Sequence, residues 1–164
     1  MKNSLRDLYI HELRNLFSAE MQLVDILAKM SEAAVSAELR TVIVEHLNET
    51  IDELNRLEEI FKSQDLSPRG RHCASIECLA AECRELLRES AEPEMLDAAM
   101  IAIAQKVGHF EIAGYGTAKA YATMLGDKRA EQLLSATLED EKRVDRKLTH
   151  LAALFVNRGA LEAA

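Results

Sequence analysis

Apolar residues recur every three to four positions along most of the chain, and polar residues fill the positions between them. This period is typical of amphipathic helices, and no stretch alternates apolar and polar residues with period two over a useful length. Near the start, Ser4 and Asp7 resemble a capping box that opens the first helix. The pattern therefore predicts an all-α protein, with helices over residues 4–33, 38–63, 75–89, 93–125 and 127–157.

Glycine and proline, which interrupt helices, stand between the predicted helices. The first 67 residues contain neither, so the first two helices are joined by a short polar connection near Ser36 and pack as antiparallel neighbours. Residues 65–92 form a longer crossover with its own short helix, Pro93 suits the first turn of the next helix, and Gly126 separates the last two. We expect residues 1–164 to form a single domain, a ferritin-like four-helix bundle of two antiparallel hairpins with a short extra helix in the crossover.

The helix predicted over residues 93–125 carries few charges and is rich in alanine and glycine. A helix that is apolar or small on most sides is usually covered on most sides. The helix over residues 127–157, in contrast, is charged along its outer face and needs only one covered stripe. We therefore expect the 93–125 helix to pack against a second copy of the chain in a homodimer. The alternative is that the crossover covers this helix within one chain.

Composition and charge exclude several classes of protein. Of the 164 residues, 48% are apolar and 29% are charged, and the net charge is -8. Nucleic-acid binding needs clustered Lys and Arg, so cations are the expected small partners instead. The longest apolar run, residues 98–104, is far shorter than the roughly 20 residues that span a bilayer, and the charged start offers no secretion signal. We expect a cytoplasmic protein that enters no membrane and keeps its three cysteines reduced.

Six acidic residues stand where the helical period places or borders apolar side chains. One lies in the apolar stripe of the first helix and one on the inward line of the fourth, while the second and last helices each offer two acids one turn apart. These residues are Glu20, Glu111, Glu49 with Glu53, and Glu141 with Asp145. Any one of them alone is more often a solvated or salt-bridged acid than a ligand, so the argument rests on the joint pattern.

The spacing of these acids repeats between the two hairpins. Glu20 and Glu49 are 29 residues apart, and Glu111 and Glu141 are 30 apart. At a rise of about 1.5 Å per residue, equal lengths on either side of each turn place these acids at the same height in the bundle. The sequence therefore predicts that all six carboxyl groups converge near mid-bundle.

Six carboxylates in a dry core repel one another unless they are protonated or paired. Two divalent ions supply the required positive charge, as in ferritin-like di-iron and di-manganese proteins, so iron or manganese is expected. Those proteins carry Glu-x-x-His pairs on two helices. Here His46 precedes Glu49 in the reverse order, and Asp52 stands in place of the histidine. His46, Asp52, His109 and Tyr115 are candidates for further ligands or for hydrogen-bond partners of the ligands.

Several strings of residues resemble the YciE/YciF-like stress proteins of bacteria, a branch of the ferritin-like superfamily. The strings are Ala19-Glu20-Met21-Gln22-Leu23, His46-Leu47-Asn48-Glu49-Thr50, Arg56-Leu57-Glu58 with Phe61, Cys73, His109-Phe110-Glu111-Ile112-Ala113-Gly114-Tyr115-Gly116-Thr117-Ala118, Leu125-Gly126, and Thr137-Leu138 with Glu141-Lys142, Asp145 and Leu148. The resemblance covers nearly the whole chain. It implies a four-helix bundle with an added short helix, a homodimer, a dinuclear metal site and induction under stress, without a settled reaction. The chain departs from the family at Glu53, where glutamine is expected, and this leaves the second ligand of the second helix open.

Two functions remain open on these observations. In the first, the chain is a di-iron or di-manganese carboxylate protein of the oxidative or general stress response, which oxidises iron or reacts with dioxygen or peroxide. The expected ligands are Glu20 and Glu111 as terminal or bridging ligands, Glu49 and Glu141 as bridges, and Glu53 and Asp145 to complete the shell. In the second, the chain is a metal-free helical module that binds a partner as a dimer, and its inward acids pair with Arg or Lys.

Overall fold

The computed structural model describes residues 3–89 and 92–156. Its elements are α1 (Leu5–Ala33), α2 (Ala37–Ser63), α3 (Ala74–Arg88), α4 (Pro93–Leu125), α5 (Lys128–Leu151) and a π-helical turn, η1 (Ala152–Val156). No strand occurs in these described residues, and the predicted all-α class is confirmed. The predicted bounds differ from the observed ones by one residue at most, except at the end of α5. That helix gives way to η1 after Leu151, and its predicted end at residue 157 lies outside the described residues.

Polar side chains fix the ends of the long helices. The hydroxyl of Ser4 accepts a hydrogen bond from the backbone N–H of Asp7 (3.1 Å), and that of Ser36 accepts one from Leu39 (3.1 Å). Such caps satisfy N–H groups that have no partner inside the first turn of a helix. At the other end, α4 stops at Gly126, whose backbone has φ 75°, a left-handed conformation that glycine adopts without steric cost. Local sequence therefore determines where these helices begin and end.

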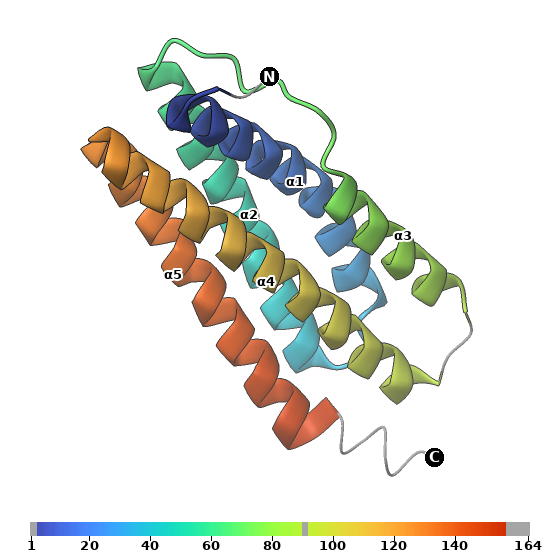
Figure 1. Cartoon of the computed structure of the whole chain (residues 1–164). Coiled ribbons are helices and arrows are strands. Elements are labelled where there is room, and N and C mark those ends of the chain that lie inside the picture. Colours follow the sequence, from blue (N-terminus) through green and yellow to red (C-terminus); the bar gives the residue numbers. More distant parts are fainter. Residues whose placement is uncertain (1–2, 90–91, 157–164) are drawn as a thin grey trace.

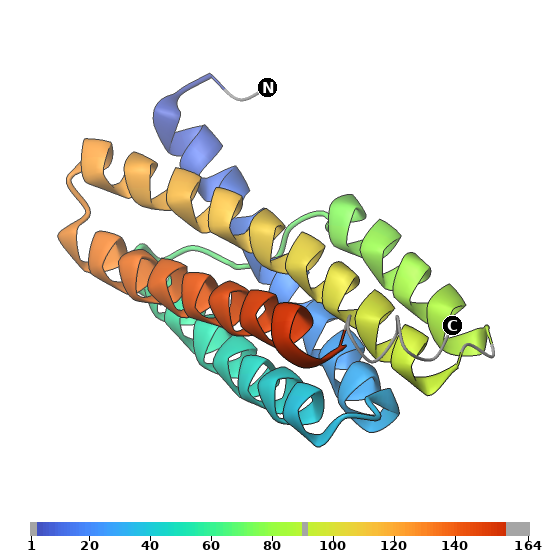
Figure 2. The same cartoon turned by 90° about the horizontal axis from the view of Figure 1, so that it is seen from below.

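The four long helices α1, α2, α4 and α5 pack lengthwise against one another, and α3 lies along α1 and α4 (Figure 1, Figure 2). α1 and α2 form one antiparallel hairpin, and α4 and α5 form the other. Across the two hairpins, α1 packs on α4 and α2 packs on α5. Among the described residues, none of the helices is both long enough and apolar enough to cross a membrane.

The apolar interior is divided into two clusters of buried side chains. One contains Leu23, Ile43 and Val107, and the other contains Leu13 and Phe61. On each long helix the chain passes from one cluster to the other through at least one buried polar residue. The residues at these crossings are Glu20 on α1, His46, Thr50 and Glu53 on α2, Glu111 on α4, and Thr137 and Glu141 on α5. A layer of polar side chains therefore lies across the middle of the molecule, between the two apolar clusters.

Within one chain, α4 is covered by α1, α5 and the crossover helix α3. The remaining face of α4 carries small exposed side chains such as Ala113 and Ala120. Near the C-terminal end of the helix, Met124 is 76% exposed. The crossover thus covers part of this helix, as the alternative interpretation of the sequence required. The homodimer through this helix stays a prediction.

A buried carboxylate on α4 holds the turn between α1 and α2. Asp97 is only 3% exposed, and its two oxygens accept hydrogen bonds from the backbone N–H groups of Val35 (2.9 Å) and Ser36 (2.7 Å). Hydrogen bonds to a charged acceptor are stronger than neutral ones, and a buried N–H left without a partner is costly. The second hairpin therefore fixes the turn of the first.

We expect Asp97→Ala to lower the free energy of unfolding by about 2–3 kcal/mol, because two backbone donors lose their acceptor. Urea denaturation followed by circular dichroism measures this change. Asp25→Ala is the matched control, since Asp25 pairs only with Lys29 on an exposed helix face, and it should cost less than about 0.5 kcal/mol. Equal effects of the two substitutions would contradict the role given to Asp97.

Candidate metal centre

Five ionisable side chains of the polar layer come from all four long helices. Glu20, Glu53, Glu111 and Glu141 are each fully buried, and His46 is 1% exposed. His46 and Glu53 are seven residues apart on α2, which is about two helical turns, so both side chains leave the helix on the same face. The helical period and the packing of the hairpins together bring these five groups to one place.

The five groups form two overlapping sets. The Nε2 atom of His46 lies 3.5 Å from a carboxylate oxygen of Glu111 and 3.5 Å from one of Glu141. In this set, and in a second set made by Glu20, Glu53 and Glu111, one potential ligand atom per residue lies within 4.8 Å of the others. Glu111 is therefore the residue that the two sets share.

One hydrogen bond orients a member of the cluster. The phenol of Tyr115 is fully buried and donates a hydrogen bond to Oε1 of Glu20 (2.7 Å). A donor of this kind fixes the direction of a ligand carboxylate, a common arrangement behind metal sites. Tyr115 thus takes the supporting position that the sequence analysis allowed for it.

Most polar atoms of the cluster have no hydrogen-bond partner within the part of the chain that the structure describes. They are Oε2 of Glu20, Nε2 of His46 and both carboxylate oxygens of Glu53, Glu111 and Glu141. Nε2 of His46 makes the 3.5 Å ion-pair contacts with Glu111 and Glu141 described above. A buried polar atom without a partner is rare in folded proteins, because no hydrogen bond offsets the free energy lost when the atom leaves water. Carboxylate and imidazole groups are the ligands of iron and manganese, and these unpartnered atoms fit such ions.

Burial changes the acidity of three of the carboxyl groups. It raises the pKa of Glu20, Glu53 and Glu111 well above the ordinary value of 4.5, and the charges of neighbouring carboxylates raise these pKa values further. Without a cation, burial and mutual repulsion therefore shift these groups toward the protonated form. A bound cation reverses this preference, because it stabilises the carboxylate form.

His46 and Glu141 behave as a buried ion pair. Burial disfavours the imidazolium, but the carboxylates of Glu141, Glu53 and Glu20 together outweigh that effect and raise the pKa of His46 above 6.5. Burial likewise disfavours the ionised form of Glu141, but interaction with His46 lowers the pKa of this carboxyl group below 4.5. In the absence of metal, His46 and Glu141 therefore stabilise each other's charged forms.

The expected convergence of six carboxylates must be corrected to four, because Glu49 and Asp145 lie outside the cluster. Oε1 of Glu49 accepts a hydrogen bond from a guanidinium nitrogen of Arg143 (2.7 Å). Asp145 is 21% exposed and lies near the exposed His109, 3.8 Å away. Each of these acids is four residues from a cluster member, which turns it by about 40° around its helix, enough to move it to an edge.

Two other candidates also lie outside the cluster. His109 is 66% exposed, because it is two residues before Glu111 and leaves α4 on nearly the opposite face. Asp52 is exposed on α2 next to the buried Glu53. His46, in contrast, was only an alternative ligand in the sequence analysis, and the structure places it inside the cluster. Its spacing of seven residues from Glu53 was the signal that could have identified it.

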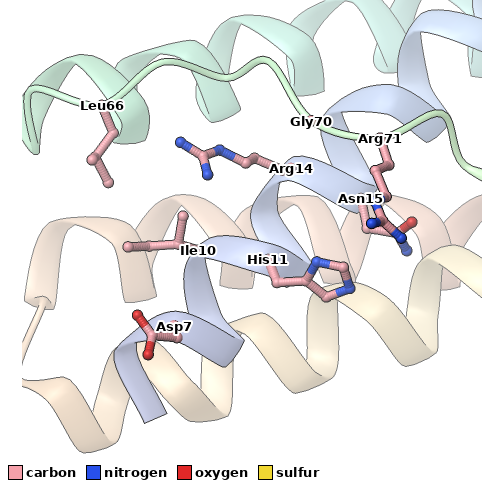
Figure 3. Close-up of a pocket in the computed structure, with 8 residues that line it drawn as sticks. All are labelled: Asp7, Ile10, His11, Arg14, Asn15, Leu66, Gly70 and Arg71. Atoms are coloured by element: carbon pink, nitrogen blue, oxygen red, sulfur yellow. The ribbon is translucent and has the colours of Figure 1, made fainter. Parts of the chain in front are cut away.

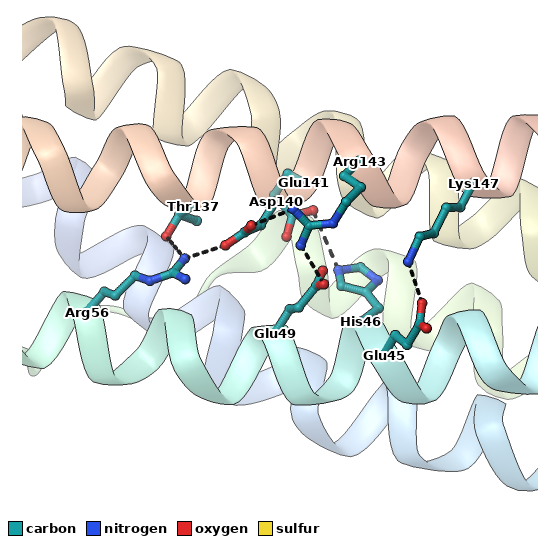
Figure 4. A network of polar contacts seen from close by, with 9 residues as sticks. All are labelled: Glu45, His46, Glu49, Arg56, Thr137, Asp140, Glu141, Arg143 and Lys147. Atoms are coloured by element: carbon teal, nitrogen blue, oxygen red, sulfur yellow. Dashed lines mark hydrogen bonds and ion pairs between the residues drawn. The ribbon is translucent and has the colours of Figure 1, made fainter.

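Ion pairs follow the seam between α2 and α5, beside the buried cluster (Figure 4). Arg56 donates to Asp140 (2.7 Å) and to the hydroxyl of the buried Thr137 (3.0 Å). Arg143 donates to both Asp140 (2.8 Å) and Glu49 (2.7 Å). The sequence analysis did not predict this network, because charged residues on an outer helix face are usually exposed to solvent.

A surface pocket of about 820 Å³ lies away from the cluster, between α1 and the crossover (Figure 3). It is lined by Asp7, Ile10, His11, Arg14, Asn15, Leu66, Gly70 and Arg71. The guanidinium of Arg14 donates to the carbonyl oxygen of Ser67 (3.1 Å) and ties the crossover to α1. Two arginines on its walls make this pocket a poor site for divalent cations.

Long packed helices around four buried carboxylates and an imidazole define an all-helical protein with a candidate dinuclear metal centre. Residues 4–161 match the family described as "Domain of unknown function (DUF892)", and the chain belongs to this family. It is similar to Protein YciF of Escherichia coli (strain K12), with 40% identity over 158 residues, which is 96% of this chain and 95% of that protein. The resemblance read from the sequence is therefore confirmed.

Solved structures agree with this assignment. The crystal structure of the E. coli stress protein YciF matches with a TM-score of 0.90 and 40% identity, over 94% of this chain and 98% of that one. A second structure, YcfI of Rhodopseudomonas palustris, matches with a TM-score of 0.86 and 38% identity, over 90% of this chain and 94% of that one. The description of YcfI proposes a structural role for that protein.

Proposed function

We propose that this protein is a ferritin-like four-helix bundle that binds two divalent transition-metal ions, iron or manganese, in its polar layer. The observation that carries this proposal is the set of eight buried carboxylate and imidazole atoms without hydrogen-bond partners among the described residues. Four carboxylates carry four negative charges, and two divalent ions carry four positive charges. Metal binding therefore neutralises the cluster and gives its unpartnered atoms ligand bonds.

The two metal positions differ in chemistry. One is built only of oxygen ligands, from Glu20, Glu53 and Glu111, and the other adds the nitrogen of His46 to Glu111 and Glu141. Oxygen-only sites favour harder ions such as manganese, whereas imidazole suits iron and later transition metals. Glu53 supplies the carboxylate that makes the first position complete. The departure from the family's expected glutamine therefore adds a ligand in this chain.

The surroundings of the cluster suit redox chemistry at the metals. Two such ions supply one-electron or two-electron chemistry with dioxygen or peroxide. The protein's own part is to hold the ligands, to orient Glu20 through Tyr115, and to keep bulk water out with the apolar clusters on either side of the layer. The E. coli relative is called a stress protein, and we propose oxidative or general stress as the setting of this chain.

A second candidate function is a metal-free structural bundle. The ion pair of His46 with Glu141 and the raised pKa values of the other three acids reduce the negative charge of the cluster without metal. The structural role proposed for YcfI favours the same reading. In this case the polar layer serves to specify how the helices align.

Metal content separates the two functions. Protein purified without chelator and dialysed against iron(II) without oxygen, or against manganese(II), should hold about two ions per chain by inductively coupled plasma mass spectrometry. Loading should release protons, because burial raises the pKa of the ligand carboxyl groups and metal binds their ionised form; calorimetry in buffers of different ionisation enthalpy measures this release. Folded protein that holds less than about 0.2 ions per chain would favour the metal-free bundle.

A further inference from the structure

The buried cluster needs a route by which cations reach it. Its five members are at most 1% exposed, and the apolar clusters close the interior on both sides of the polar layer. Between α1 and α4 the packing at Gly114 is tight, since a Cβ atom there would lie only 2.7 Å from the side chain of Leu16. The seam between α2 and α5 differs, because charged side chains bridge it directly beside the cluster (Figure 4).

Glu49 occupies a special position in this seam. It follows His46 by three residues and precedes Glu53 by four, so members of the cluster lie one turn away on both sides. Its Oε1 accepts a hydrogen bond from Arg143, whose side chain is 43% exposed. Its Oε2 is buried and has no hydrogen-bond partner among the described residues. The carboxylate of Glu49 therefore joins the surface ion pairs to the polar interior.

Arg143 has a second partner that allows it to release Glu49. Its other terminal nitrogen donates to Oδ1 of Asp140 (2.8 Å), and Asp140 is only 17% exposed on its side chain. If Arg143 leaves Glu49, it keeps this charged partner and does not become an isolated cation. An arriving divalent ion can thus replace the guanidinium on Glu49 without leaving either Glu49 or Arg143 unpaired.

The polar contacts between α4 and α5 lack this combination. Asp145 is half-buried there, between Gln105 and His109, but neither of its oxygens is buried without a partner. It has no basic side chain comparable to Arg143 among its described contacts. The Glu49 position alone, among these two seams, combines a replaceable counter-charge with an unpartnered inner oxygen.

We propose that Glu49 takes divalent cations from the α2–α5 surface and passes them to the buried cluster, with Arg143 as the counter-charge that each cation displaces. This inference rests on the proposed function, since it requires a cluster that binds metal. The cation exchanges its water ligands for a Glu49 oxygen and then for the cluster, and the protonated groups of the cluster release their protons to solvent as they bind it. Glu49 is therefore a residue of the access route and is absent from the final ligand set.

The test measures the rate of cobalt(II) uptake by the full chain after chelator treatment. Stopped-flow absorption of the bound ion gives the rate, and plasma mass spectrometry after dialysis gives the final content. We expect Glu49→Gln to slow uptake at least about tenfold while leaving the final cobalt content within about 10% of that of the unmodified chain. Arg143→Gln, which removes the competing cation, should accelerate uptake severalfold.

Glu45→Gln is the matched control. It removes an acid on the same seam, paired with Lys147 of α5, but the oxygens of Glu45 are not buried without a partner. Its uptake rate should stay within about twofold of that of the unmodified chain. Circular dichroism establishes that each variant is folded.

Three results would overturn the inference. Unchanged uptake by Glu49→Gln removes Glu49 from the route, and slowing by Glu45→Gln to the same extent shows general surface attraction instead. A lower final cobalt content in Glu49→Gln shows that Glu49 is a ligand. If the unmodified chain binds no cobalt, iron or manganese at equilibrium, the proposed function itself fails. The final metal content of the unmodified chain is measured first, so this failure is distinguished from a failure of the proposed access route.

Discussion

Replacing Glu111 with glutamine should remove both metal ions from each chain. Glu111 is the one residue that belongs to both potential ligand sets, so its loss takes a carboxylate from each metal position. Metal content after loading should fall from about two ions per chain to less than about 0.2. Loading should then no longer raise the unfolding midpoint, whereas each ion at about 100 times its dissociation constant stabilises the unmodified chain by about 2.7 kcal/mol.

The same substitution should stabilise the metal-free protein. Without cations, Glu111 is a buried acid whose pKa is raised by burial and by neighbouring carboxylates, and glutamine of similar shape removes that ionisable group. We expect the free energy of unfolding in chelator to rise by about 1–3 kcal/mol, measured by urea denaturation. A substitution that abolishes metal binding and yet stabilises the metal-free protein is expected for a buried acidic site that requires cations.

Glu53→Gln is the matched comparison, because Glu53 belongs to only one ligand set. It should leave about one ion per chain, held at the position that contains His46. It also restores the residue expected in the family, so the fold should tolerate it. Loss of both ions in Glu53→Gln, or retention of both in Glu111→Gln, would refute the assignment of Glu111 as the shared ligand.

The metal-free protein should become less stable as the pH rises from 5 to 7. Glu20, Glu53 and Glu111 have folded-state pKa values well above their ordinary value of 4.5, so in this range the folded chain binds more protons than the unfolded chain. Stability therefore falls with rising pH, by up to about 1.4 kcal/mol per pH unit for each group. The stabilisation is complete below about pH 4.5 and is lost progressively above it.

The pair of His46 and Glu141 does not reverse this trend. The pKa of His46 is raised from 6.5, so its contribution is also lost as the pH rises above that value. The pKa of Glu141 is lowered from 4.5, so its contribution is lost only as the pH falls below that value, outside the window. We expect a net loss of stability between about pH 5 and pH 7.

Urea denaturation in chelator at several pH values measures this slope. The metal-loaded protein should show the opposite slope over the same range, because metal binding releases protons and strengthens as the pH rises. In Glu111→Gln, the free energy of unfolding of the metal-free protein should fall less steeply with rising pH, because one of the three carboxyl groups is missing. A metal-free stability that is flat or increases between pH 5 and 7 would contradict protonation of the buried cluster.

Much of the fold could be read from the sequence, because helix ends depend on local chemistry. Ser4 and Ser36 cap the helices that the periodic pattern predicts, and Gly126 ends α4 by a backbone conformation that most residues adopt only at a cost. The inward positions of Glu20, Glu111 and Glu141 also followed from the helical period, since each lies well inside an apolar stripe. The predicted end of the last helix at residue 157 lies outside the described residues, and within them η1 follows α5 directly after Leu151.

The choice between neighbouring acids was beyond the sequence. On α2, Glu49 and Glu53 differ by about 40° around the helix, and on α5 the same angle separates Glu141 from Asp145. The rotation of each helix against its neighbours decides which acid faces the interior. Arg143, from the opposite hairpin, then pairs with the acid at the edge of α2.

Sequence alone therefore determined the helices, their caps and the presence of acids in the apolar stripes, since these depend on residues within a few turns of one another. Only the tertiary structure decided which five groups meet, that Glu111 stands between two sets of ligands, and that Glu49 is held by Arg143. These features depend on contacts between residues as far as 95 positions apart, such as His46 and Glu141. The packing of the two hairpins sets those contacts, and no local pattern encodes them.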